Sequence, residues 1–464
     1  MAPEEILARH AAALERRRPL EALWQDCYAH VLPPATGGQP LFDATAADAA
    51  EQLAASLLAE LTPPWSRWFG LAPAQPDAAA AALLSAATQR LQGHIDRSNF
   101  AMEMHQAFID LVVAGTGLLL VEEAPLGEAS ALRFTAVPLR QAALLEGDSG
   151  RLDSIFRELR LMPAEIRRRW PGAALPRQQE AAPLRVVEAV WPQAHGLGFA
   201  AVLAEAGAPP VLLAEGRFAE SPFIAFRWLK APGESYGRSP VMKALPDIRT
   251  ANKVVELVLK NASIAATGIW QAEDDGVLNP ATVKLVPGAI IPKAPGSAGL
   301  TPLAAPGNFD ISQLVLDQLR TRIRSALLAD RLGPPQDARL TATEVLERSA
   351  ATARLLGAAY GRLQSELLTP LIARCLGILR RRGEVPALLP DGREAVLRYE
   401  SPLARVQARA DAANTLLFLQ SLASLGGQAA AQVDPVAATR WLAQMLGTPP
   451  EVLLPAPPPT PIPE

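Results

Sequence analysis

Two segments near the middle of the chain carry apolar residues with the period of an α-helix. In residues 240–267 the apolar side consists of Val241, Leu245, Ile248, Val255, Leu259 and Ala262, and the polar side of Arg249, Lys253, Glu256 and Lys260. In residues 309–330 the two sides are Ile311, Val315, Leu319, Ile323 and Leu327, and Asp317, Arg320 and Arg324. The first helix would be roughly 40 Å long at about 1.5 Å per residue. The pair predicts an antiparallel helical hairpin.

A hairpin that is amphipathic along both arms cannot cover its apolar stripes by itself. Further copies of the chain would cover them, and head-to-tail contacts that close by rotation produce a ring. Residues 268–308, between the two helices, are rich in proline and glycine, and their best candidate strand is Val283–Ile291. We expect this segment to form a compact, β-like head on the hairpin.

The N-terminal half predicts an α+β architecture. Helical patterns cover residues 4–30, 44–61, 77–98 and 100–114, and a short helix follows Pro163. Runs with β character occupy residues 131–137, 141–146, 151–161, 185–191, 199–204 and 223–229. Gly147-Asp148-Ser149-Gly150, between two of these runs, is typical of a hairpin turn. An antiparallel sheet is therefore expected between the N-terminal helices and the hairpin.

The C-terminal part is again mainly helical. Residues 331–340 predict a loop, after which Thr341 and Glu344 form a capping box. The helix that they start can run to about residue 382, but Pro370 must kink or divide it. Two segments complete the chain, a helical one at 404–446 and a proline-rich one at 449–464 that we expect to be extended.

The charge of the chain limits how it could bind nucleic acid. A formal net charge of -3 argues against a broad basic face, so any contact with DNA should be local and weak. All six lysines nevertheless fall in one central window, at positions 230, 243, 253, 260, 284 and 293. This clustering makes the central hairpin the best candidate for contact with a polyanion.

The cysteines, the N-terminus and the apolar runs indicate the cellular compartment in which the protein folds. Cys27 and Cys375 lie far apart and show neither a disulfide framework nor the spacing of a zinc site, which fits folding in a reducing environment. The N-terminus carries Glu4 and Glu5, and the apolar run at 111–121 is short and interrupted by glycine. We therefore expect neither secretion nor a membrane span.

Gly233-Glu234-Ser235-Tyr236-Gly237 matches the nucleophile elbow of serine hydrolases. Such enzymes need a histidine after the serine, but no histidine follows His195. We favour a loop role for Ser235. The same stretch does not match the sequence pattern of a phosphate-binding loop. Gly115-Thr116-Gly117 likewise does not match the pattern of a dinucleotide-binding loop. The spacings of the histidines predict no metal site. The sequence thus predicts no catalytic residue, cofactor or metal.

Several blocks of sequence occur in a characteristic order. They are Leu61-Thr62-Pro63-Pro64-Trp65-Ser66-Arg67-Trp68-Phe69, Pro222-Phe223, Tyr236-Gly237-Arg238-Ser239-Pro240, Thr341-Ala342-Thr343-Glu344-Val345 and Ser401-Pro402-Leu403-Ala404-Arg405. Together they resemble the portal, or head-to-tail connector, family of short-tailed double-stranded DNA phages. The resemblance covers about residues 5–445 and implies a ring, typically of twelve copies, at one vertex of a capsid.

The resemblance also implies names for the parts of the chain. Residues 1–239 and 341–400 would be the wing, 240–267 and 309–330 the two stem helices, and 268–308 the clip. Residues 331–340 would be the channel loop, 401–448 a short helical crown and 449–464 a proline-rich tail. The implied fold is therefore the phage portal fold, of the α+β class.

The resemblance implies a non-enzymatic channel subunit for packaging and ejecting double-stranded DNA, which also nucleates head assembly. It would belong to the virion after assembly in the host cytoplasm, and its partners would be a terminase motor, the major capsid and scaffolding proteins and a tail adaptor. We expect DNA contacts at Lys253, Lys260, Arg320, Arg324, Arg331 and Arg339. The alternatives are a serine hydrolase that uses Ser235 and a cellular helical scaffold protein.

Overall fold

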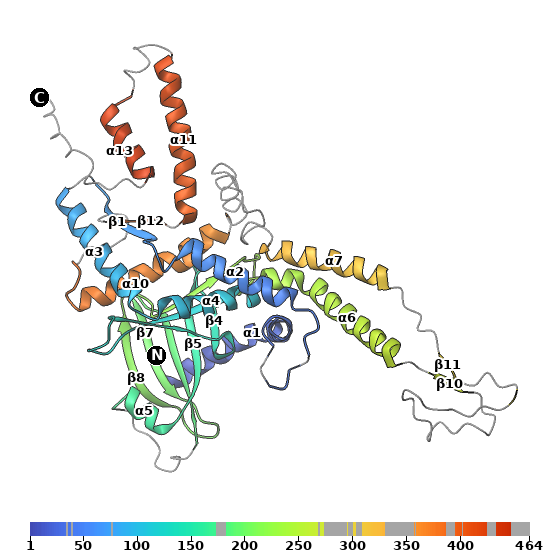
Figure 1. Ribbon diagram of the computed structural model, residues 1–464. Coiled ribbons are helices and arrows are strands. Elements are labelled where there is room, and N and C mark those ends of the chain that lie inside the picture. Colours follow the sequence, from blue (N-terminus) through green and yellow to red (C-terminus); the bar gives the residue numbers. More distant parts are fainter. Residues whose placement is uncertain are drawn as a thin grey trace, which may run out of the picture.

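The computed structural model describes residues 1–33, 36–38, 40–75, 78–172, 182–267, 270–272, 295, 300–302, 309–329, 357, 359–386, 395–400, 402–424 and 433–446. These residues form a body of helices and antiparallel sheets, from which a pair of helices projects (Figure 1). The mixture of helix and sheet confirms the predicted α+β class.

The described helices follow the predicted periodicity closely. Their bounds are α1 (Pro3–Val31), α2 (Thr45–Leu61), α3 (Ala78–Asp96), α4 (Phe100–Ala114), α5 (Pro163–Arg169), α6 (Pro240–Thr267), α7 (Phe309–Ala326), α10 (Thr369–Arg381), α11 (Pro402–Ser424) and α13 (Pro435–Leu446). Two short turns accompany them, η1 (Leu139–Gln141) and η2 (Gln364–Leu368). The predicted helices in the first 114 residues and the two central helices are thereby confirmed.

The strands form four antiparallel groups among the described residues. Their bounds are β1 (Phe69–Pro73), β2 (Thr116–Glu123), β3 (Leu132–Ala136), β4 (Ala142–Glu146), β5 (Leu152–Leu161), β6 (Leu184–Pro192), β7 (Leu197–Leu203), β8 (Val211–Phe218), β9 (Phe223–Arg227), β10 (Trp270–Ala272), β11 (Leu300–Pro302) and β12 (Ala395–Tyr399). The five-stranded sheet has the order β4-β5-β6-β7-β8, and the three-stranded sheet has the order β3-β2-β9. β1 pairs with β12, and β10 with β11.

The six predicted strand runs between residues 131 and 229 are confirmed, whereas β1, β2 and β8 were not among them. β2 begins with six consecutive buried residues, so it lacks the alternation that marks a half-buried strand. β8 is an edge strand that is largely exposed and contains Gly216, and β1 ends in Pro73. Tertiary packing, rather than local pattern, therefore determines these strands.

Two predicted features of the C-terminal part change in detail. The helix before Pro370 is interrupted as expected, by the π-helical turn η2, in which the backbone N–H of Thr369 donates to Gln364 O. Residues 404–446 do not form one helix, because Val433 and Asp434 are not helical. The Asp434 carboxylate accepts a hydrogen bond of 2.8 Å from Val436 N, which begins α13 as a new helix. The predicted features at 283–291, 331–340, 341–344 and 449–464 lie outside the described residues.

The five-stranded sheet has helices on both faces (Figure 1). On one face, Ile6 and Ala13 of α1 pack against Phe156 of β5 and Trp191 of β6. On the other, Ile166 of α5 packs on Leu184, Val186, Ala201 and Leu203. The predicted turn at Gly147–Gly150 joins β4 to β5, and Gly150 has the positive φ of 74° that such a turn favours. Strands buried on both faces account for the apolar runs in this part of the sequence.

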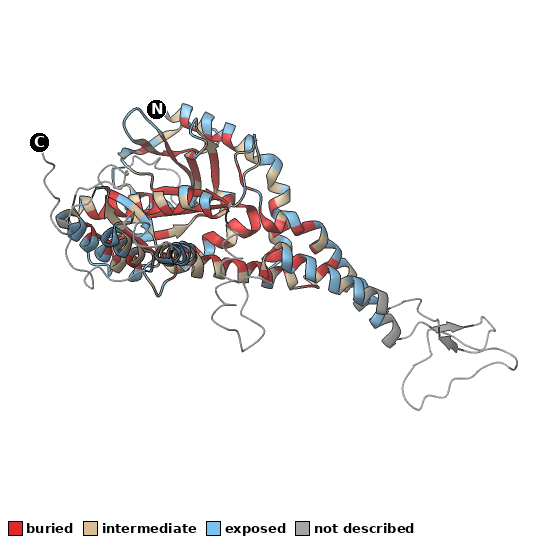
Figure 2. Ribbon diagram, turned by 90° about the horizontal axis from the view of Figure 1, so that it is seen from above, coloured by how far each residue is buried: buried red, intermediate tan, exposed pale blue. Residues whose placement is uncertain are grey.

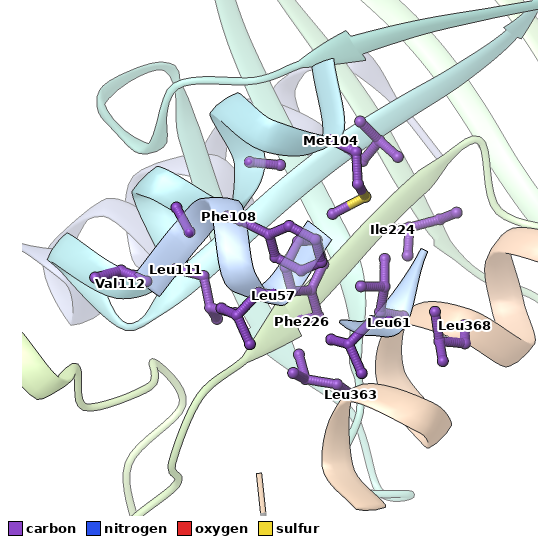
Figure 3. Packing of buried hydrophobic residues seen from close by; sticks show 14 of the residues in the cluster. Leu57, Leu61, Met104, Phe108, Leu111, Val112, Ile224, Phe226, Leu363 and Leu368 are labelled. Atoms are coloured by element: carbon purple, nitrogen blue, oxygen red, sulfur yellow. The ribbon is translucent and has the colours of Figure 1, made fainter. Parts of the chain in front are cut away.

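The largest apolar core joins the N-terminal helices to parts of the chain that are distant in sequence. Leu57 and Leu61 of α2 and Phe108 of α4 meet Phe226 of β9 and Leu368 of η2 (Figure 3). Buried residues fill the centre of the body, and exposed residues become more frequent along the projecting helices (Figure 2). This core therefore fixes the base from which α6 and α7 extend.

A fully buried ion pair, Arg227 with Glu366, connects four segments of the body. Arg227 Nη2 lies 2.6 Å from Glu366 Oε1, and Nε lies 3.2 Å from Oε2. The same guanidinium donates to Ser235 O at 2.9 Å and to Gly150 O at 2.7 Å. One side chain of β9 thus binds η2, the β4–β5 turn and the loop at 233–237.

Replacing Glu366 by leucine should strongly destabilise the protein, because the buried Arg227 guanidinium loses its closest counter-charge and keeps the looser contact with Glu146 at 3.6 Å. We expect the free energy of unfolding to fall by about 3 to 5 kcal/mol. Urea unfolding followed by tryptophan fluorescence measures this change. The control is Glu128→Ala, which removes an exposed ion pair with Arg133 and should have little effect. Equal losses in the two variants would contradict the importance of the buried pair.

Candidate functional site

The two central helices form the predicted antiparallel hairpin, and they project together from the body (Figure 1). We call residues 240–251 and 319–329 the root of the hairpin. Val241, Leu245 and Ile248 of α6, Ile323 of α7 and Leu327 just after α7 are buried there in the main core. The inner part of both apolar stripes is therefore covered by the chain's own helices.

The outer half of the hairpin, residues 252–263 and 313–318, is different. Leu257 and Leu259 of α6 are 47% and 53% exposed, and Leu314 and Val315 of α7 are 62% and 40% exposed. Within the described part of the chain, roughly half of the surface of each of these apolar side chains is left uncovered. The prediction that other copies of the chain cover the apolar stripes of the two helices therefore applies only to this outer half.

Ion pairs fix the direction in which the hairpin projects. Arg322 Nη2 of α7 lies 3.0 Å from Asp247 Oδ1 of α6, which joins the two helices at the root. Arg320 Nε lies 2.9 Å from Asp43 Oδ2, just before α2, and Arg249 pairs with Asp26 of α1. The root is therefore tied to two N-terminal helices by charge as well as by apolar contact.

Asp43 is the centre of the contacts at the root. It is 5% exposed, and its Oδ1 accepts a hydrogen bond of 3.0 Å from Thr45 N in the first turn of α2. Asn252 Oδ1 accepts from Phe42 N and Asp43 N at 2.7 and 3.1 Å. Burial would raise the pKa of Asp43, but hydrogen bonds from Thr45 and Arg320 outweigh burial, so the pKa lies below its usual value.

The predicted DNA-contact residues divide into three groups. Lys253 and Lys260 are exposed on α6, and both pair with Glu256, at 2.9 and 2.5 Å. Arg324 is exposed on α7, whereas Arg320 is held by Asp43. Arg331 and Arg339 lie outside the described residues. The two lysines lie seven positions apart, hence on the same face of α6, with part of their charge neutralised by Glu256.

The loop at Gly233–Gly237 has a packing role. A Cβ atom on Gly237 would lie 2.0 Å from Gly115 O, so the two backbones can touch only because both residues are glycines. Gly115 also has a φ of +78°, where it ends α4 and begins the turn into β2. Close packing therefore accounts for both glycine motifs.

Ser235 lacks the partners of a nucleophile among the contacts that the structure describes. Its backbone oxygen accepts from Arg227, and histidines make their contacts elsewhere: His10 with Phe156, His30 with Asp26 and His94 with Glu384. Across the described ranges, no three His, Cys, Asp or Glu residues are grouped to hold a metal ion. Burial raises the pKa of both Cys27 and Cys375 to about 12, which disfavours reactive thiolates.

None of the helices in the described part of the chain is both long and apolar enough to cross a bilayer.

Replacing Asp43 by asparagine should destabilise the hairpin root, with a clear dependence on pH. Because the folded pKa of Asp43 is lowered, the carboxylate stabilises the fold above its unfolded pKa, and this contribution disappears as pH falls through the folded pKa. Thermal melting should show a lower Tm for Asp43→Asn near pH 7 and a smaller difference below about pH 4. The control is Asp317→Asn, an exposed residue 4.0 Å from the same Arg320. A decrease in Tm that is constant with pH would exclude this role.

Comparison with known proteins assigns the chain to a family. A family model described as bacteriophage head to tail connecting protein matches residues 3–454. A probable portal protein of Bordetella phage BPP-1 is 26% identical over 89% of this chain and 80% of its own length, and a portal protein of Salmonella phage epsilon15 is 22% identical over 97% and 89%. A chain from the virion of a native gene transfer agent particle has a TM-score of 0.42 and 12% identity, covering 92% of this chain and 93% of its own. Since the family model spans almost the whole sequence, the chain belongs to the bacteriophage head-to-tail connecting protein family.

Proposed function

We propose that the chain is a portal subunit, one of about twelve copies in a ring that forms the channel for double-stranded DNA at one capsid vertex. The observation that carries the proposal is the outer half of the hairpin, where exposed leucines and lysines lie on the same projecting element. Membership of the head-to-tail connecting family and relatives named portal proteins support it.

The arrangement of the exposed leucines suits a ring better than a simple pair. Leu257 and Leu259 are two residues apart on α6, so their side chains point in nearly opposite directions, about 160° apart around the helix axis. One flat partner cannot cover both. In a head-to-tail ring each subunit has a neighbour on either side, and each neighbour can cover one of the two leucines.

The proposed parts are those that the resemblance implies. Residues 1–239 and 341–400 are the wing, α6 and α7 the stem, 268–308 the clip, 331–340 the channel loop and 401–448 the crown. We further propose that the ring contacts a terminase motor, major capsid and scaffolding proteins and a tail adaptor, and that it assembles in the host cytoplasm before it becomes part of the virion. The ring would nucleate head assembly and have no catalytic step of its own.

Neither alternative function gains support. A serine hydrolase would need a base beside Ser235, but the loop that holds Ser235 is explained by its bond to Arg227 and the contact of Gly237 with Gly115. A cellular scaffold protein gives no reason for residues 3–454 to match a phage connector family.

Placing carboxylates on the outer half should prevent ring assembly, because it would bury charge between subunits. We expect Leu259→Asp with Leu314→Asp to convert rings into monomers, as seen by negative-stain microscopy and native mass spectrometry. The matched control is Leu126→Asp, which changes a leucine that is 90% exposed in the turn between β2 and β3. Rings formed equally well by the double variant would show that these leucines do not lie between subunits.

Reversing two charges on α6 should impair DNA transit without preventing assembly. We expect Lys253→Glu with Lys260→Glu to lower the amount of DNA packaged per particle. For purified rings, it should reduce the slope of log affinity against log salt by about two, since two phosphate contacts are lost. Lys243→Glu is the control, because Lys243 is exposed on a different face of the same helix. Unchanged packaging and an unchanged salt slope would show that neither lysine contacts DNA in the channel.

A further inference from the structure

A second feature of the body, far from the outer half of the hairpin, is a pocket of about 570 Å³. It lies between α10, the end of β2, α5 and the strands β6 to β8. Arg374, Arg380 and Arg381 line it from α10, Arg217 and Phe218 from β8, and Glu188 from β6. A volume in this range suits a small ligand or a few side chains, and it is too small for a DNA duplex.

Arg374 is the residue that gives the pocket its chemistry. It is 3% exposed, and within the described residues its guanidinium pairs with no carboxylate. Its described hydrogen bonds go to two backbone oxygens, Val121 O at 3.2 Å and Glu220 O at 3.4 Å, and the guanidinium lies 5.0 Å from the centre of the Phe218 ring. Burial, helped by nearby Arg381, lowers the pKa of Arg374 to about 10, so it still carries its charge at neutral pH.

The surrounding charges leave an excess of positive charge around the pocket. Five arginines and three glutamates line it. Glu188 is neutralised by Arg169, which lies 2.9 Å away, and Arg381 is only loosely held by Glu123 at 3.7 Å. Arg217 is exposed and forms no ion pair within the part of the chain that the structure describes. Glu220 and Glu122 favour the charge of Arg374 from a distance, but within the described residues neither forms an ion pair with it, so a directly bound anion would further offset its desolvation.

The apolar walls indicate what kind of molecule brings the anion. Leu120, Phe199, Pro222 and Phe223 line the pocket with Phe218. A free inorganic anion would leave these walls uncovered, whereas an acidic side chain next to apolar ones would bind both the guanidinium groups and the walls. Arginine forks bind carboxylates in the bidentate geometry that such a contact needs.

We infer that this pocket binds an acidic peptide segment of a partner protein, with a carboxylate on Arg374, Arg381 and Arg217 and an apolar neighbour against Phe218. The inference does not depend on the portal function, because none of these residues belongs to the hairpin. It assigns the face between the five-stranded sheet and α10 to protein recognition.

The test measures binding of a fluorescein-labelled peptide, acetyl-Leu-Asp-Phe-Glu-amide, to the full-length assembled protein by fluorescence anisotropy. We expect saturable binding that weakens at least tenfold when asparagine and glutamine replace the two acids. This change corresponds to the loss of a hydrogen bond to a charged group. Binding of the amide peptide that is as tight as that of the acidic one would overturn the inference.

Variants locate the binding and separate it from folding. Arg217→Glu and Arg381→Gln change exposed or half-exposed side chains and should each weaken binding severalfold without lowering the Tm. Arg398→Glu, on the exposed side of β12 outside the pocket, should leave binding unchanged. If Arg398→Glu weakens binding as much as Arg217→Glu does, general charge attraction explains the result and the pocket is excluded.

Inorganic phosphate distinguishes the two sources of an oxyanion. We expect millimolar phosphate to compete weakly with the peptide, and we expect replacement of leucine and phenylalanine in the peptide by alanine to weaken binding. If phosphate displaces the peptide fully and the alanine peptide binds equally well, the pocket holds a free oxyanion and the inferred peptide partner is wrong.

Discussion

From one buried position, the guanidinium of Arg227 binds three other segments of the chain. Its charge is offset mainly by Glu366, a buried residue of the π-helical turn η2, and also by Glu146, which lies 3.6 Å from the same guanidinium. The sheet β3-β2-β9, the β4–β5 turn and the loop before α6 are thereby held to the helix that returns from the C-terminal part. The position of the hairpin depends on this arrangement, since α6 begins directly after the loop.

The helices and half of the described strands could be predicted because their patterns are local. The amphipathic period of α6 and α7, the proline at 370 and the turn at Gly147–Gly150 are all visible in the sequence and are all confirmed. β2 could not be recognised, since a strand that is buried on both faces has no alternating pattern. The helical segment at 404–446 was predicted without its interruption, where Asp434 and Pro435 begin a new helix.

The candidate site was visible only in part for a related reason. The basic residues of α6 and α7 were apparent from their spacing, but the ion-pair partners of Arg249, Arg320 and Arg322 at the root lie in other segments. Asp43, 277 residues before Arg320, carries no local sign that it holds that arginine. The Arg374 pocket likewise combines residues from distant elements, and no motif in the sequence brings them together. Pairing over long sequence distances is what the sequence alone does not reveal.

Among the described residues, the hairpin packs against the body at its root and projects away from it (Figure 1), so it has the mechanics of a lever. A sideways force at the far end of a helix about 40 Å long acts on its base with a long moment arm. The apolar packing of the root resists such torque together with the Asp43–Arg320, Asp26–Arg249 and Asp247–Arg322 contacts, which all lie within the base. A small rearrangement of these acid–base contacts would therefore swing the distal end through a much larger arc, so the stiffness of the arm is set at its foot.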